Sequence, residues 1–223
     1  MRSSADSSDR PGAGHPPGRG YEVAKRAFDV AFAAVGIAAL SPVLLAVAAA
    51  VRLTSPGPIL YRGRRIGRDG RAFHIMKFRT MRPDAERLGT TTALGDPRIT
   101  PVGHLLRRYK LDELPQLFNV LRGEMSVVGP RPEVEEHTRE YTAEERAILD
   151  VRPGITDYAS IHFVALDEVL GSENPHEVYV TRVRAEKNEL RLRYVRRRSF
   201  GEDLRIIAMT VGAIARKATG RPA

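Results

Sequence analysis

Two adjacent carboxylates, Asp112 and Glu113, stand where the sequence pattern predicts the start of a helix. Apolar residues recur at helical spacing over Leu114–Leu121, and Pro115 fits only in a first turn, where backbone N–H groups have no helical partner. Asp112 is therefore expected at or near the N-cap, at the helix end that carries partial positive charge and attracts phosphate. A carboxylate beside a bound phosphate, with a cation between them, is equipped for phosphoryl transfer. A plain helix cap is the commoner origin of such a pair.

Basic residues elsewhere are candidates for binding that phosphate. Arg131 lies between two prolines, which stiffen the backbone and can hold its planar guanidinium ready for a phosphate. A turn with an exposed arginine is the plainer interpretation. Arg107 lies five residues before Asp112 and is a further candidate for the same site.

Lys77 and Arg79 flank Phe78 in a segment with the alternation of a β-strand. Alternate side chains of a strand point to the same face, so both cations could face the phosphate. A solvated face of the sheet fits the pattern almost equally well. The histidines show no metal-ligand spacing and receive no role.

The apolar segment Val30–Val51 contains no charged residue and is long enough to cross a bilayer. Ser41 and Pro42 lie at its midpoint, and the proline removes a helical hydrogen bond and kinks the chain. Both flanks are basic, whereas a span places one flank outside, against the positive-inside tendency. We therefore predict a re-entrant helix that turns at Ser41-Pro42, each half about 16 Å long and one leaflet deep. The rivals are a buried core helix and, more strongly, a straight span, because membrane helices tolerate proline.

The remaining patterns predict an α+β protein that is mainly helical. Residues 1–20 are rich in Ser, Gly and Pro and are expected to be disordered. A β-hairpin is expected over Ile59–Met81, and helices are expected over His104–Lys110, Leu114–Arg122, Pro132–Leu149 and Glu177–Lys217.

The basic C-terminal region carries an apolar face formed by Leu204, Ile207, Val211 and Ile214. This face suits an ordinary surface helix packed on a core and a helix lying on an anionic membrane surface equally well.

Composition narrows the classes of function. The net charge of +9 over 223 residues points to an anionic partner, which could be nucleic acid, acidic lipid or a phosphorylated substrate. No zinc-ligand spacing or aromatic-rich RNA-binding motif accompanies the charge, so no nucleic acid partner is expected. The absence of cysteine excludes disulfides, thiolate metal sites and a cysteine nucleophile.

A series of short motifs, taken in order from Tyr21 to Arg216, resembles one family. The motifs are Lys25-Arg-Ala-Phe-Asp29, Ser41-Pro42, Ser55-Pro-Gly-Pro58, Lys77-Phe-Arg-Thr-Met81, Asp96-Pro-Arg-Ile-Thr100, Leu111-Asp-Glu-Leu-Pro115, Val128-Gly-Pro-Arg-Pro132 and Arg152-Pro-Gly-Ile-Thr156. Each is weak alone, but their order is specific. The chain resembles the monotopic bacterial sugar transferases, which are polyprenyl-phosphate glycosyl-1-phosphate transferases.

The resemblance implies a re-entrant membrane anchor at residues 21–54, after the tail at residues 1–20, and a cytoplasmic catalytic domain at residues 55–218. That domain would hold a small β-hairpin and interfacial amphipathic helices around the catalytic core. In the family, the aspartate that matches Asp112 is the nucleophile and a Mg²⁺ ligand, and the glutamate that matches Glu113 completes the catalytic pair. Arg131, Arg107, Lys77 and Arg79 are expected to bind substrate.

The resemblance also implies the reaction: a UDP-sugar donates its sugar 1-phosphate to undecaprenyl phosphate through a covalent aspartyl intermediate, and UMP is released. It would be the first membrane step of glycoconjugate synthesis (exopolysaccharide, capsule, O-antigen or glycoprotein glycan). Its place would be the cytoplasmic face of the bacterial inner membrane, among the phospholipids. The sugar, the pathway and a homodimer stay open. A catalytically inactive membrane-bound scaffold is the alternative, and an assay for UMP release separates the two.

Two positions depart from the family's commonest pattern. Asp157-Tyr-Ala-Ser160 stands where many members have Gly-Trp-Ala-Gln, and Glu124 stands where aspartate is usual. Neither change removes the expected chemistry, but the first leaves the sugar preference open. The resemblance implies a minimal catalytic form, without the extra N-terminal membrane helices of larger members.

Overall fold

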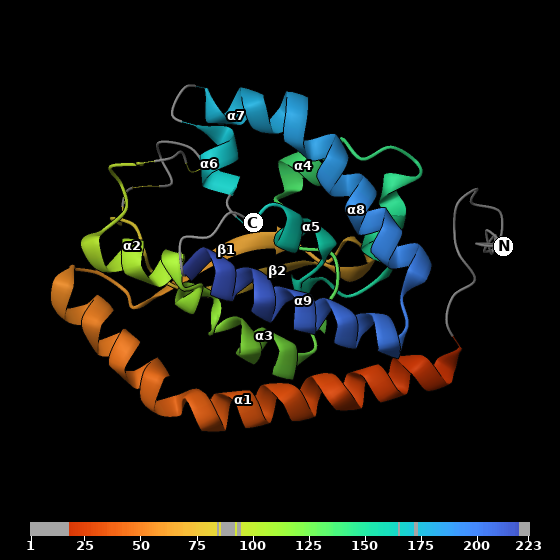
Figure 1. Cartoon of the computed structure of the whole chain (residues 1–223), viewed down its shortest axis with the longest axis horizontal. Helices are drawn as coiled ribbons and strands as arrows, with labels where there is room; N and C mark the ends of the chain where they lie inside the picture. The colour runs from red at the N-terminus through yellow and green to blue at the C-terminus, as the bar shows by residue number, and fades with distance from the viewer. Residues whose placement is uncertain are drawn as a thin grey trace, which may run out of the picture.

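The structure is a computed structural model that describes residues 18–83, 85, 92, 95–164, 166–171 and 174–218. The expected disorder of residues 1–20 lies outside the described residues for residues 1–17, whereas Arg19 and Gly20 already belong to the first helix. A long helix runs along one edge of the molecule, and the other helices and two small sheets pack above it (Figure 1). This arrangement confirms the α+β, mainly helical class.

Most of the described residues lie in helices, with four short strands between them. The helices are α1 (Arg19–Thr54), α2 (Pro101–Arg108), α3 (Gln116–Arg122), α4 (Glu135–Arg139), α5 (Tyr158–His162), α6 (Leu166–Leu170), α7 (Pro175–Val178), α8 (Arg184–Arg197) and α9 (Phe200–Ala218), and the strands are β1 (Leu60–Ile66), β2 (Ala72–Phe78), β3 (Ser126–Val128) and β4 (Gly154–Thr156).

Strands β1 and β2 form the expected antiparallel hairpin, with Leu60 opposite Phe78. The connecting turn contains Asp69 and Gly70, whose φ angles of 57° and 73° lie in the left-handed region. Positive φ at consecutive turn residues matches the right-handed twist of the strands, which explains a tight reversal here. The hairpin carries Lys77 on its second strand.

Strands β3 and β4 form a parallel pair in which Gly129 and Gly154 approach each other closely. A Cβ on Gly154 would lie 2.1 Å from the backbone nitrogen of Gly129, so neither position has room for a side chain. The loop that follows β3, and with it Arg131, is therefore held directly against β4.

The first half of α1 is fixed to the body by charged side chains. Arg26 donates to the carbonyls of Val120 and Leu121 at 2.6 and 2.9 Å, so it satisfies the C-terminal end of α3. Asp29 is 1% exposed and accepts the backbone N–H of Val127 at 3.0 Å. Each of these residues has its own partner on the body, so the pairing of Arg26 with Asp29 that their spacing allows is not formed.

The second half of α1 packs against the body through apolar side chains. Val47 and Val51 form a cluster with Phe78 and Leu106. Between the two anchored halves, α1 changes direction (Figure 1). Pro42 lies inside the helix and accounts for the bend, because it cannot donate a helical hydrogen bond.

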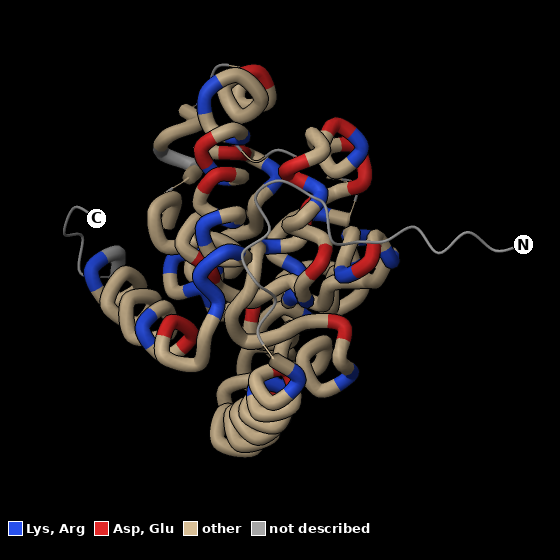
Figure 2. Tube along the Cα trace, turned by 90° about the vertical axis from the view of Figure 1, so that its right-hand side faces the viewer, with Lys and Arg blue, Asp and Glu red and all other residues tan. Residues whose placement is uncertain are grey.

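α1 leaves a large apolar surface uncovered. In the view of Figure 2, it stands at the lower edge as a helix almost free of charged residues, whereas charges are frequent on the body above it. By length and composition, α1 is the one helix among the described residues that could cross a membrane. Only 11% of its most apolar 18-residue stretch is buried. Exposed apolar residues along it include Val23, Val35, Leu45 and Leu53.

Two expected helices are broken by side-chain caps. The stretch Pro132–Leu149 splits into α4 and a 3₁₀ turn, because Thr142 and Glu145 each accept the other's backbone N–H. The C-terminal stretch is interrupted after α8, where the Ser199 hydroxyl accepts the Glu202 N–H at 3.2 Å and starts α9.

Helix α2 begins three residues earlier than expected, because Thr100 caps it by accepting the N–H of Gly103 at 3.0 Å. A Cβ on Gly103 would lie 2.1 Å from the carbonyl oxygen of Thr80. Only glycine therefore lets α2 rest against the end of the hairpin.

We predict that Gly103→Ala destabilises the protein by about 1–3 kcal/mol, because a backbone carbonyl cannot move aside easily. Thermal unfolding in detergent measures the effect. Gly201→Ala in the first turn of α9 is the matched control: its added Cβ meets no atom of another segment within 4 Å, so no destabilisation is expected. Equal unfolding temperatures for Gly103→Ala and the wild type would contradict the close contact.

Candidate active site

Asp112 lies in a 3₁₀ turn, Leu111–Glu113, between α2 and α3. Lys110 precedes it with a φ of 55°, which reverses the chain at the end of α2. The N-cap position of α3 belongs to Pro115, and no side chain caps either the turn or the helix. Asp112 thus lies near the N-cap, as expected, but its side chain does not cap the helix: the chain is already wound into a turn before α3, and Oδ1 of Asp112 has no hydrogen-bond partner among the described residues.

Glu113 is held between two cations. Arg131 grips both of its carboxylate oxygens, with a distance of 2.9 Å from Nη1 to Oε2, and Lys77 donates to Oε1 at 3.0 Å. Burial alone would raise the pKa of the Glu113 carboxyl, but Arg131 and Lys77 hold that pKa well below its usual value. The site thus joins β2, the 3₁₀ turn and the loop after β3.

Asp112 is in a different state from its neighbour. It is 7% exposed, and its Oδ1 has no hydrogen-bond partner among the described residues. Burial, followed by the charge of Glu113, raises the pKa of Asp112, while Lys77, Lys110 and Arg107 oppose the shift. An unpartnered buried carboxylate beside paired cations is suited to receive an electrophile or a cation from a ligand.

Gln116, the first residue of α3, is a further buried polar side chain without a hydrogen-bond partner among the described residues. It lies four residues after Asp112 along the nearly continuous helical path, is fully buried, and neither atom of its amide has a partner among the described residues. Leaving a buried polar group unpaired costs about 1–3 kcal/mol. The pattern of apolar residues gave no sign of this glutamine.

The donor set fits a magnesium ion shared with a substrate. The described residues contain no cluster of three or more His, Cys, Asp or Glu side chains, and Glu113 is occupied by its cations. Mg²⁺ in proteins is commonly held by one or two carboxylates together with substrate phosphates. Asp112, with an unpartnered oxygen, offers such a carboxylate.

The two remaining predicted residues differ in position. Arg107 donates through Nε to the Thr80 hydroxyl at 2.9 Å and acts electrostatically on Asp112, so it lies at the edge of the site. Arg79 does not join it: β2 ends before this residue, and its guanidinium bonds the backbone oxygens of Ser55 and Pro56 after α1. Its contacts anchor the end of α1, and a role in substrate binding stays a prediction.

A second buried ion cluster, which the sequence pattern did not reveal, supports the loop of Arg131. Glu133 accepts the hydroxyl of Tyr179 and the guanidinium of Arg191, both at 2.7 Å, and Lys187 lies 3.8 Å away. Lys187 and Arg191 lie four residues apart on the buried face of α8. A lysine and an arginine four residues apart on the buried face of a helix need a buried acid as partner. This spacing is the sequence signal that could have indicated the cluster.

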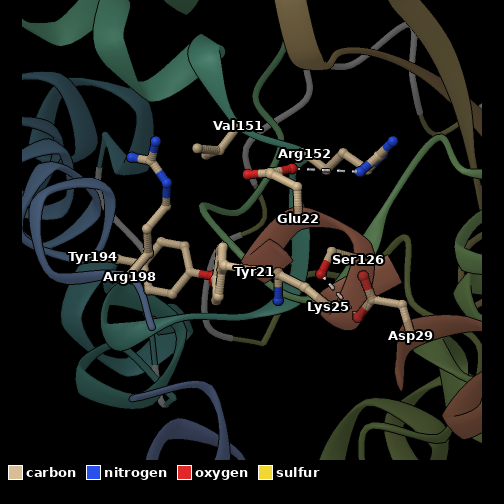
Figure 3. A pocket seen from close by; sticks show the side chains of 9 residues that line it. All are labelled: Tyr21, Glu22, Lys25, Asp29, Ser126, Val151, Arg152, Tyr194 and Arg198. Carbon is tan, nitrogen blue, oxygen red and sulfur yellow. Dashed lines mark hydrogen bonds and ion pairs between the residues drawn. The ribbon is translucent and has the colours of Figure 1, made fainter. Parts of the chain in front are cut away.

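A small cavity lies apart from Asp112, where the first turns of α1 meet β3 and α8 (Figure 3). Tyr21, Lys25 and Asp29 of α1 line it together with Ser126 and Tyr194. None of the predicted site residues contributes to it. The cavity is thus part of the attachment of α1 to the body.

Comparison with known proteins connects the chain to a family. The family described as bacterial sugar transferase matches residues 20–217. The UDP-glucose:undecaprenyl-phosphate glucose-1-phosphate transferase of Escherichia coli (strain K12) is 39% identical over 195 residues, which cover 84% of this chain and 39% of that protein. The exopolysaccharide production protein ExoY of Sinorhizobium fredii (strain NBRC 101917 / NGR234) is 38% identical over 208 residues, which cover 86% of this chain and 85% of that protein.

A third relative carries a different sugar in its name. The UDP-N-acetylgalactosamine-undecaprenyl-phosphate N-acetylgalactosaminephosphotransferase of Aeromonas hydrophila is 41% identical over 152 residues, which cover 66% of this chain and 36% of that protein. The chain therefore spans about two fifths of the length of the E. coli relative and most of the length of ExoY.

We predict that Glu133→Gln destabilises the protein by about 3 kcal/mol near neutral pH, because Arg191 and Lys187 lose the carboxylate nearest to them and only the more distant Asp157 still faces Arg191. The pKa of Glu133 is held well below its usual value by Arg191 and by its hydrogen bond with His137, against the effect of burial. A lowered folded-state pKa stabilises above the unfolded-state pKa, and this contribution disappears as the pH falls through the folded-state value.

Urea unfolding of both proteins across pH measures the difference in the free energy of unfolding. The difference is expected to be full near neutral pH and to shrink below about pH 4. A gap that stays constant into acid would contradict the ionised pairing of Glu133.

Proposed function

Because the chain belongs to the bacterial sugar transferase family, we propose that it transfers a sugar 1-phosphate from a UDP-sugar to undecaprenyl phosphate. The names of the E. coli and Aeromonas relatives differ in the sugar but share UDP and undecaprenyl phosphate, and the proposal takes only the shared parts. The products would be a polyprenyl-diphosphate sugar and UMP. The name of ExoY supports a role in exopolysaccharide or related glycan synthesis.

The observation that carries the mechanism is the contrast between two adjacent carboxylates. Glu113 is bound to Arg131 and Lys77, whereas the buried Asp112 has an oxygen without a partner among the described residues. In the first step a carboxylate oxygen of Asp112 attacks the β-phosphorus of the donor. The bond from that phosphorus to the bridging oxygen breaks, and UMP leaves with the oxygen.

The second step restores the enzyme. A phosphate oxygen of undecaprenyl phosphate attacks the phosphorus carried by Asp112, the bond to the carboxylate breaks, and the lipid-linked diphosphate sugar is formed. Arg131 and Lys77 offset the charge on the phosphoryl oxygens in both steps. A Mg²⁺ ion held by Asp112 and the substrate phosphates would further neutralise that charge.

The attachments of α1 support a re-entrant helix over a straight span. Glu22 lies 3.6 Å from Arg68 at the tip of the hairpin, so the first turn of α1 touches the body. The other end is bound by Arg79. Buried contacts at Ala33 and Val47 leave no run of about 20 residues free to be surrounded by lipid. If α1 crossed the membrane, its two ends would lie on opposite sides, and a single folded domain could not contact both of them.

The position of the site supports chemistry at the height of the lipid headgroups. Leu111, which precedes Asp112, packs against the cluster of Val47 and Val51 in α1. A helix that dips into the cytoplasmic leaflet would thus place Asp112 near a lipid phosphate. In this proposal, residues 21–54 anchor a catalytic domain of residues 55–218 at the inner membrane.

The exposed residues of α9 also support an orientation in which the α1 side of the molecule faces the membrane. Two residues of its predicted apolar face, Leu204 and Val211, are 46% and 64% exposed, whereas Ile207 of the same face packs against the core. Phe200, at the start of α9, makes an edge contact with Phe28 of α1 at 5.3 Å. The exposed side of α9 therefore joins the apolar surface of α1 at this end, as expected of a helix on a membrane surface.

We predict that Asp112→Asn abolishes UMP release and covalent labelling by a donor that carries radioactive β-phosphate. Asparagine keeps the shape of the side chain but has no anionic oxygen to form the bond. Circular dichroism of the purified variant confirms that it is folded. More than trace turnover by a folded Asp112→Asn protein would refute the covalent mechanism, and absence of UMP release from the wild type would favour an inactive scaffold.

We predict that single cysteines at Gly20 and Arg71 are both shielded from a membrane-impermeant thiol reagent applied outside cells. Both positions are exposed on the protein, and the native chain contains no cysteine that would react. Replacing Ser41 and Pro42 with leucines should move the probe at position 20 to the outside in part of the population and lower activity. Labelling of that probe from outside in the otherwise native sequence would establish a span.

A further inference from the structure

We propose that Asp157 is a positioning residue that fixes the backbone of Arg131, and that Arg191 holds Asp157 and Glu133 in place from α8. The inference rests on the proposed function, in which Arg131 binds the phosphates of the donor. Asp157 touches neither Asp112 nor Glu113 through any described hydrogen bond, and it acts through Arg131.

The two carboxylate oxygens of Asp157 serve two backbone groups that are far apart in the sequence. Oδ1 accepts the N–H of Ser160 at 2.6 Å and caps α5, while Oδ2 accepts the N–H of Arg131 at 3.0 Å. The side chain is fully buried. A hydrogen bond to an ionised acceptor is stronger than a neutral one, and no solvent competes for it here.

Arg191 connects Asp157 with the far side of the same loop. Its Nε lies 4.0 Å from Oδ2 of Asp157, and one of its terminal nitrogens lies 2.7 Å from Oε1 of Glu133. The guanidinium is fully buried, and Glu133 follows Arg131 by two residues. The backbone of Arg131 is therefore held at its own N–H and again two residues later.

This support matters because of where the Arg131 side chain ends. Its guanidinium binds both oxygens of Glu113, next to Asp112, so a shift of the backbone would displace the phosphate-binding fork. A planar fork is sensitive to orientation, and small displacements of groups that position substrate reduce rates strongly. A charge network rooted in α8 thereby sets the geometry at the other end of Arg131.

The chemistry of aspartate allows a selective test. Asparagine has one acceptor oxygen where aspartate has two, so Asp157→Asn can serve Ser160 or Arg131 but not both. Asp157→Ser retains a good helix cap and is too short to reach Arg131 as well. Thr54→Ala is the matched control, because it removes an exposed side-chain bond to the carbonyl of Ala50 at the end of α1 and no bond to Asp157, Arg191 or Arg131.

The probe is UDP, the part common to all UDP-sugar donors, and calorimetry of the full chain in detergent measures its Kd. We expect Asp157→Asn and Asp157→Ser each to raise the Kd about tenfold, the loss expected for one charge-assisted hydrogen bond. Thr54→Ala should leave the Kd unchanged. Arg131→Lys alone should also raise the Kd, because lysine lacks the fork.

The double variant Asp157→Asn/Arg131→Lys decides whether Asp157 acts through Arg131. We expect its Kd to match that of Arg131→Lys alone, because the fork that Asp157 positions is already absent. Fully additive effects, or an Asp157→Ser protein that binds UDP like the wild type, would overturn the inference and leave the proposed function standing. Failure of the wild type to bind UDP would refute the proposed function and the inference with it.

Discussion

The ion pairs of Glu113 are the interaction on which the site depends. A buried carboxylate is costly unless cations and hydrogen bonds compensate it, and here the compensation comes from Lys77 on β2 and Arg131 after β3. Those pairs draw three separate segments to one point. They also leave Asp112, the adjacent residue, with an unpartnered oxygen in a strongly cationic neighbourhood. The cations bind Glu113 and not Asp112, and this choice is why one acid is paired while its neighbour keeps an oxygen available.

Buried charges connect this point to the rest of the molecule. Glu133 and Arg191 tie the loop of Arg131 to α8, while Arg26 ties the end of α3 to α1. The partners of these buried charges are mostly backbone groups or fixed ions. The interactions therefore fix the relative positions of the segments and contribute little to hydrophobic stabilisation. Helix α1 and the candidate site are consequently parts of one folded unit, and the cluster of Val47 and Val51 reaches to Leu111 beside the carboxylates.

Local patterns were enough to predict the hairpin, helix α3 and the carboxylate pair, because each depends on neighbours in the sequence. The partners of buried charges could not be predicted in this way: Arg79 faces the end of α1, and Asp157 faces Arg131, through contacts made only when the chain folds. The breaks at Thr142 and Ser199 were a different case. Their capping signatures are present in the sequence, but helical periodicity alone hides them.

The attachment of α1 at both halves has a consequence for how such a segment can evolve. Each residue added to an α-helix turns everything beyond it by about 100° and advances it by ~1.5 Å. An insertion between Ala33 and Val47 would rotate Val47 and Val51 out of their cluster or pull Arg26 away from α3. Substitutions of the exposed apolar residues carry no such penalty. Selection on this stretch therefore acts on the number of residues far more than on their identity, and lineages should diverge here by exchange of one apolar residue for another, with its length kept constant.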